Sequence, residues 1–459
     1  MLYLDRIREA LKDGSVKYAV ILGLFILLTA PLSWLYYDIR YYIDWYKVVF
    51  RNPLHTIVVR LNPNTPSLIL TIPSGLLRVY VEADKVSYPP LPVLLFVATY
   101  AAANAVTRYL PLIRLIIKLP LILSYYSITY LIGKNYGSKA RMLWLTNVFS
   151  FITIYTYHTD LIVALAILLA YISYTKNKLF VTGVMASIAF LFKPFSVIPL
   201  LPIVLKTIYC LNTRSLAKLT LGFITTTAIV ILPFFLVNPW IFIYKAVLYH
   251  SYRYPQEYSL WAIPIYAANY DFTKIPEFIV WLWFPIYLIT IVYVAIHMIR
   301  KKNFDELNVL KYVVILSLLS LLINKIGNLN YFTWYLPLII IYITKTELHR
   351  DNRFLTIYVS IPTALGVLAG FFTFYAAFVV GEPIYIIEDR SLYSPYIAEK
   401  SFDPTTIQAI LAEFFRLNAL WFFKPLYESS NLSYIIYTLL YNIFLIYMVI
   451  KFVCIKHGT

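Results

Sequence analysis

Runs of roughly 20 apolar residues, the length that crosses a bilayer as a helix, recur along almost the whole chain. Lipid offers the backbone no hydrogen-bond partners, so each run that crosses it must form a helix. Of the 459 residues, 61% are hydrophobic and only 13% are charged, whereas a soluble domain has about 25% charged residues. The chain is therefore predicted to be an all-α polytopic helical membrane protein.

About twelve membrane-spanning helices are expected from these runs. The predicted spans are 18–37, 110–132, 141–157, 161–175, 180–193, 195–210, 218–237, 276–299, 311–327, 331–344, 354–380 and 433–452. Three segments then lie outside, of which the first, 38–109, is long, and the others are 238–275 and 381–431. The apolar run 89–107 is interpreted as an interfacial or re-entrant helix, because a full span there would move three basic clusters to the outer side.

Positive charge is concentrated on one predicted side of the membrane. With the N-terminus inside, the inner segments hold 21 of the 39 Lys and Arg residues but seven of the 22 Asp and Glu residues. Cytoplasmic segments collect Lys and Arg, so both termini are predicted to be cytoplasmic in a multi-pass cell-membrane protein. The net charge of +17 is thus explained by Lys and Arg in the cytoplasmic segments of a protein whose partner is the lipid bilayer, and no nucleic-acid partner is expected.

Two carboxylates follow the first predicted span, in the segment Asp38-Ile-Arg-Tyr-Tyr-Ile-Asp44. A carboxylate held where a helix meets water can take a proton from a hydroxyl as a new bond forms, so Asp38 is the candidate general base. Asp44 lies six residues later and would not share its helical face, so it is a candidate supporting or metal-binding carboxylate. The alternative is that both are ordinary interfacial acids.

A second polar turn, Tyr155-Thr-Tyr-His158-Thr-Asp160, separates two predicted spans at the outer surface. His158 and Asp160 are candidate ligands of a divalent metal, Mg²⁺ or Mn²⁺, or residues that orient a phosphate. The alternative is helix capping, because an acid is stabilising in the first turn of a helix.

Several cations lie in apolar surroundings near the predicted outer ends of spans. A lysine within a span is costly unless it pairs, so Lys193, which precedes Pro194, is a functional candidate by default. Arg108, Arg114 and Lys118 form a second group, and Arg253 lies in the second outer loop, with His250 and Lys325 as weaker candidates. Cations at a lipid interface suit a phosphate ligand. The alternative is snorkelling toward lipid headgroups.

The order of these motifs resembles the GT-C superfamily of integral membrane glycosyltransferases, which use polyprenyl-phosphate-linked sugars. The resemblance covers about residues 18–345. Its motifs are Asp38 with Tyr42, Tyr88-Pro-Pro-Leu91, Arg108 with Arg114, Ala140-Arg141, Asp160, Gly183 to Lys193-Pro194, and Asn324-Lys325 through Tyr331 to Pro337. The resemblance implies that Asp38 is the base or a metal-linked carboxylate and that Asp160 is the acid opening a later span. The Trp-Trp-Asp motif of the oligosaccharyltransferase branch is missing, so we expect a monosaccharide transferase.

The resemblance implies a transferase that moves one sugar, such as mannose, from a polyprenyl phosphate to a hydroxyl on a glycan, lipid or protein at the extracytoplasmic face. Residues 1–345 would be the catalytic module and residues 346–459 a C-terminal membrane region. Arg108, Arg114, Lys118, Lys193 and Arg253 would bind the donor phosphate. Two alternatives stay open: a transporter or flippase for lipid-linked sugars, and a non-catalytic subunit of a membrane complex.

Overall fold

A computed structural model describes residues 12–32, 39–51, 55–59, 68–72, 75–83, 85–210, 213–269, 271–374, 384–387, 393–396 and 430–455. Most of these residues are helical, and five helices are long and apolar enough to cross a membrane. The five are Pro111–Leu145, Thr213–Val237, Trp283–Lys301, Glu306–Ile323 and Asn431–Cys454. The prediction of an all-α helical membrane protein is confirmed at this level, and the number of twelve spans stays a prediction.

The N-terminal part contributes one apolar helix and a group of helices that follow it. These elements are α2 (Gly14–Thr29), η1 (Ala30–Leu32), α3 (Ile39–Arg51), η2 (Gly75–Arg78), α4 (Val79–Glu82) and α5 (Pro90–Val106). Asp38 lies outside the described residues. The run interpreted as interfacial or re-entrant is the continuous helix α5, which packs on α3 and α6.

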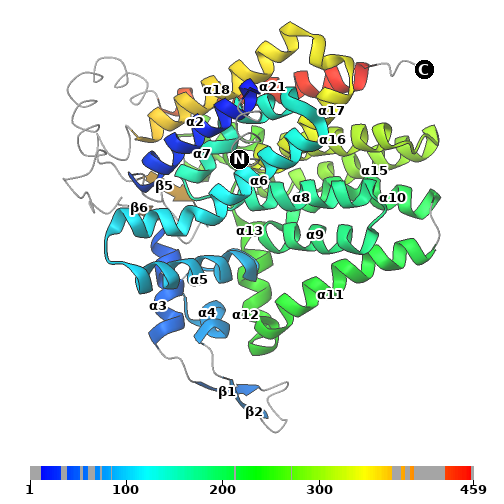
Figure 1. The fold of residues 1–459 in the computed structure, drawn as a ribbon. Coiled ribbons are helices and arrows are strands. Elements are labelled where there is room, and N and C mark those ends of the chain that lie inside the picture. The colour runs from blue at the N-terminus through cyan, green and yellow to red at the C-terminus, as the bar shows by residue number, and fades with distance from the viewer. Residues whose placement is uncertain are drawn as a thin grey trace, which may run out of the picture.

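The main bundle consists of long helices that run alongside one another. They are α6 (Leu110–Leu145), α7 (Val148–Tyr155), α8 (Asp160–Thr175), α9 (Leu179–Phe192), η3 (Pro194–Leu200), α10 (Leu201–Cys210), α11 (Thr213–Val237), α15 (Trp283–Lys301), α16 (Glu306–Ile323), α17 (Tyr331–Lys345), α18 (Asn352–Phe374) and α21 (Ser430–Cys454). Figure 1 shows α8 and α9 side by side, with α3 and α12 running across their direction. Every residue of α17 from Phe332 to Ile343 is buried, so α17 forms the centre of the core.

Glycines let α9 and α11 approach closely. A Cβ on Gly183 would lie 2.0 Å from the carbonyl oxygen of Leu219, and one on Gly222 would lie 2.2 Å from that of Phe180. Small residues are favoured between membrane helices because the backbones can then pack directly. Several apolar side chains on the rest of α11, among them Leu221, Ile229 and Leu236, are exposed, as expected for a helix that faces lipid.

Short elements connect the longer helices. They are α12 (Pro239–Ile243), η4 (Tyr244–Leu248), α13 (Tyr249–Tyr252), β3 (Gln256–Glu257), η5 (Leu260–Ala262), α14 (Ile263–Ala267), η6 (Phe272–Lys274), η7 (Glu277–Val280), β4 (Ile326–Gly327) and η8 (Glu347–Arg350). Two antiparallel hairpins, which the all-α prediction did not include, pair β1 (His55–Val59) with β2 (Leu68–Ile72) and β5 (Ile384–Ile387) with β6 (Tyr393–Tyr396). The β1–β2 hairpin projects away from the bundle in Figure 1.

Several of the predicted spans differ from the observed helices. The run 141–157 is not one helix, because α6 extends to Leu145 and Asn147 then caps α7 by accepting a hydrogen bond from the backbone N–H of Phe149. The first span ends as an α-helix at Thr29, and the span 311–327 ends at Ile323. Polar residues that satisfy exposed backbone groups at helix ends caused the first of these differences.

Ion pairs join the helix ends that the charge pattern placed inside. Arg141 at the end of α6 lies 3.0 Å from Asp13 before α2, and Lys345 at the end of α17 lies 2.6 Å from Glu306 at the start of α16. Lys451 of α21 lies 3.1 Å from Asp351 before α18. Residues assigned to one face by charge alone therefore meet at the same end of the bundle.

Candidate functional site

A cavity of about 250 Å³ lies at the opposite end of the helices from these ion pairs. It is formed where the end of α9 and the start of α17 meet α13, α15 and the loop before α5. Among its lining residues are Tyr88, Pro89, Lys193, His250, Lys325 and Tyr331. Four motifs that lie far apart in the sequence thus share one space.

Lys193 enters the cavity because α9 stops there. Pro194 disfavours helical geometry in the residue before it, and Lys193 is extended, with φ −147° and ψ 98°. Its Nζ lies 4.3 Å from the ring centroid of Tyr88 and 5.8 Å from that of Tyr331. These aromatic faces stabilise the ammonium group of Lys193.

Lys325 is held by a short parallel pairing between β3 and β4. Gln256 pairs with Ile326 and Glu257 with Gly327. Lys325 is only 2% exposed, and its Nζ donates a 2.7 Å hydrogen bond to the carbonyl oxygen of Ser251. Burial and the neighbouring Arg253 cation lower the pKa of Lys325 to about 7.

His250 contacts the same cavity from α13. Its Nε2 lies 2.5 Å from the carbonyl oxygen of Ser87, and a carbonyl can only accept, so Nε2 carries the proton. Desolvation and the Arg253 guanidinium lower the pKa of His250 to about 3. His250 is therefore neutral at physiological pH and helps to fix the loop that carries Tyr88.

Two buried N–H donors at this end have no acceptor among the described residues. One is the indole Nε1 of Trp283, which lines the cavity, and the other is Nε of Arg253. Arg253 uses another nitrogen, Nη2, to donate to Oε1 of Gln256 at 2.6 Å. No carboxylate belongs to the described residues that line the cavity. Two lysines and two open N–H donors around one cavity suit an anionic ligand with several oxygens.

Asp160 lies beside the cavity and is fully buried. It is the first residue of α8, and its Oδ1 accepts a hydrogen bond from the indole of Trp334, which lines the cavity. Its Oδ2 has no hydrogen-bond partner in the described part of the chain and lies 3.7 Å from Nδ1 of His158. The side chains of His158 and Asp160 are therefore close together, as predicted. Asp160 also lies in the first turn of α8, where the capping alternative places it, but no side chain among the described residues caps this helix.

Metal binding at this pair stays a prediction. Two side chains offer few ligands, since Mg²⁺ favours six oxygens, some of them from water. Among the described residues no group of three His, Cys, Asp or Glu side chains comes together.

Asp44 lies on α3, half-buried, and does not line the cavity. The next residue, Trp45, is buried and donates a 2.7 Å hydrogen bond to the carbonyl oxygen of Lys85. Its ring meets that of Tyr88 edge-on, with centroids 6.4 Å apart. The helix that follows Asp38 is thereby packed against the loop that carries the Tyr88-Pro-Pro motif.

The second predicted group of cations lies elsewhere. Arg108 is exposed between α5 and α6. Arg114 and Lys118 are buried on α6, where Lys118 donates a 2.9 Å hydrogen bond to the carbonyl oxygen of Ala30. None of the three lines the cavity, so the cavity brings Lys193 and the neighbourhood of Arg253 together without them.

Sequence reasoning missed Trp283 and Trp334 and gave Lys325 and His250 low weight. Both tryptophans lie in apolar runs, where an aromatic residue usually indicates core. The only available signal was that each falls at a helix start next to a polar loop.

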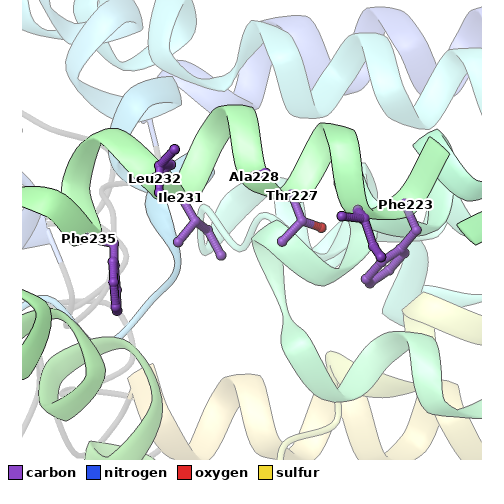
Figure 2. Close-up of a pocket in the computed structure, with 7 residues that line it drawn as sticks. Phe223, Thr227, Ala228, Ile231, Leu232 and Phe235 are labelled. Atoms are coloured by element: carbon purple, nitrogen blue, oxygen red, sulfur yellow. The ribbon is translucent and has the colours of Figure 1, made fainter. Parts of the chain in front are cut away.

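An apolar groove on α11 adjoins the cavity. Figure 2 shows Phe223, Thr227, Ile231 and Phe235 directed from α11 into one space of about 260 Å³. Ile231 lines both this groove and the cationic cavity, and Phe235 contacts Phe242 of the cavity lining with ring centroids 6.3 Å apart. An apolar track thus leads to a cationic site.

No family model matches this chain, and no curated protein or solved structure matches it.

Proposed function

We propose that this protein is an integral membrane glycosyltransferase of the GT-C type that takes a sugar from a polyprenyl-phosphate donor. The cavity carries the proposal, because Tyr88-Pro89, Lys193-Pro194, Lys325 and Tyr331 line it together. The cations of the cavity suit a phosphate, as do the N–H groups of Trp283 and Arg253, which have no acceptor among the described residues. The adjoining groove of α11 suits an isoprenoid chain.

The proposed transfer is an inverting displacement at the extracytoplasmic face. A hydroxyl of a glycan, lipid or protein attacks the sugar carbon, Asp38 takes the hydroxyl proton, and the bond from that carbon to the phosphate oxygen breaks. The polyprenyl phosphate leaves with an added negative charge, which Lys193, Lys325 and Arg253 stabilise. Asp44 supports the loop of Asp38, and Asp160 orients Trp334 at the cavity wall.

The test uses purified full-length protein in lipid nanodiscs, a panel of polyprenyl-phosphate sugars, and loss of donor as the readout. Asp38→Asn should lower turnover roughly 10²–10⁴-fold, the usual contribution of general-base catalysis, while donor binding stays near normal. Lys193→Gln should weaken donor binding. Lys274→Gln is the matched control, because Lys274 is 71% exposed and pairs with Asp271 on the surface.

Each rival function has its own result in this assay. Unchanged donor in every reaction, with lipid-phosphate binding intact, would favour the transporter. Absence of both binding and turnover would favour the non-catalytic subunit.

A further inference from the structure

Lys325 occupies an unusual place for a lysine, at the inner wall of a cavity built to receive an anion. Its ammonium nitrogen reaches the Ser251 carbonyl, and it lies 5.7 Å from the ring centroid of Trp283 and 5.8 Å from that of Trp281. A carbonyl oxygen accepts a hydrogen bond from a neutral amine as well as from an ammonium group. The Ser251 contact therefore does not require a charge on Lys325, and the two tryptophan rings favour the charged form only weakly at these distances.

The charged groups around Lys325 are mostly cations. Arg253 follows α13 and Lys193 follows α9, whereas His250 of α13 is neutral because its pKa is about 3. The acidic groups near the cavity among the described residues are Glu257 of β3, whose charge acts on Arg253, and Asp160 of α8, which bonds to Trp334. A proton on Lys325 is therefore disfavoured until an anion arrives, in line with its pKa of about 7.

We propose that Lys325 takes up a proton when a phosphate enters the cavity, so that binding of the anionic lipid is coupled to the pH of the medium. This inference rests on the proposed function for the nature of the ligand. Above pH 7 Lys325 in the ligand-free cavity is mostly an amine that donates to Ser251. With phosphate bound it is an ammonium ion that donates to a phosphate oxygen.

The coupling has a direction for the reaction cycle. The sugar-linked donor is a phosphodiester with one negative charge, whereas the released polyprenyl phosphate is a monoester with close to two at pH 7. The product therefore favours the protonated lysine more strongly than the donor does. Loss of the Lys325 proton would promote product release.

The experiment measures proton uptake when a C15 prenyl monophosphate binds to the full-length protein in nanodiscs. Titration calorimetry at pH 8.5 in two buffers of different ionisation enthalpy reports the protons taken up, and about one is expected. Affinity should fall about tenfold for each pH unit above pH 7.5, because one proton is linked to binding. In that range the probe is already a dianion, since its second pKa is about 6.

Four variants separate the possible causes. Lys325→Met should lose both the uptake and the pH slope, and Lys325→Arg should bind without either, because arginine keeps its charge. Lys193→Gln should bind more weakly but retain the slope, and Lys274→Met should match the native protein. Melting temperatures with and without the probe verify that each variant is folded.

The outcomes distinguish this inference from the proposed function. Native protein that binds the probe without proton uptake, or uptake that persists in Lys325→Met, overturns the role of Lys325 and leaves the phosphate site standing. Lack of binding by the native protein at every pH overturns the proposed function, and the role of Lys325 with it.

Discussion

Individual side chains in the cavity derive their properties from desolvation and from one another's charge. His250 has a pKa of about 3, far below the usual value of about 6.5, because it is desolvated beside Arg253. Between these pH values the unfolded protein binds a proton at His250 that the folded protein does not. The free energy of unfolding therefore falls as the pH falls from 6.5 toward 3.

A histidine variant tests this linkage. His250→Gln keeps an N–H donor for the Ser87 carbonyl but does not titrate, so its melting temperature should fall less than that of the native protein between pH 7 and pH 4.5. Carboxylates that titrate in the same range affect both proteins equally. Parallel curves for the two proteins would show that His250 is not the acid-sensitive group.

At the scale of elements, the cavity depends on a close approach between two short strands. A Cβ on Gly327 of β4 would lie 2.0 Å from the backbone nitrogen of Ser259 and 2.1 Å from the carbonyl carbon of Tyr258. Only glycine permits this pairing, which holds Lys325 beside Ser251.

Gly327→Ala should therefore displace Lys325 and weaken binding of a prenyl phosphate. Overpacking of this kind costs about 1–3 kcal/mol of stability. The control is Gly14→Ala at the start of α2, where an added Cβ would meet nothing within 4 Å. If both variants bind a prenyl phosphate equally well, at a temperature where both are folded, the β3–β4 pairing does not position Lys325 for binding.

At the scale of the whole molecule, the helices place the cationic cavity at one end and the ion pairs of Arg141, Lys345 and Lys451 at the other. Asp160 begins α8 and Lys176 follows its end, so the 16-residue helix separates them by about 24 Å. If the ion-paired end is cytoplasmic, the cavity faces outward, as the charge pattern predicts.

Inserted tags test this orientation in intact cells. Tags after Lys176 and after Lys302 should be shielded from an external probe, while tags near Pro63 and after Glu399 should be reachable. A tag that is reachable at 176–178 would place Asp160 and the cavity on the cytoplasmic face and would contradict the proposed side of transfer.

The positions of many helices, and some of their ends, could be predicted from local sequence. Apolar runs determine helices because lipid leaves the backbone no other partner, and Pro194 ends α9 at Lys193 by steric clash. The basic clusters in the sequence predicted which helix ends lie on the same side. The ion pairs of Arg141, Lys345 and Lys451 join helix ends from that predicted set. These features depend on composition, spacing and charge within short segments.

Tertiary structure decided which helix ends share the cavity. Lys193 and Lys325 line it together, whereas Arg114 and Lys118 are buried on α6, where Lys118 bonds to Ala30 of η1. The open indole donor of Trp283 and the Ser251 carbonyl that accepts from Lys325 cannot be recognised in the sequence. Packing decides whether each of these groups has a hydrogen-bond partner. The chemistry of the cavity arises from groups far apart in the chain, whose burial and mutual charge exist only after the helices have packed.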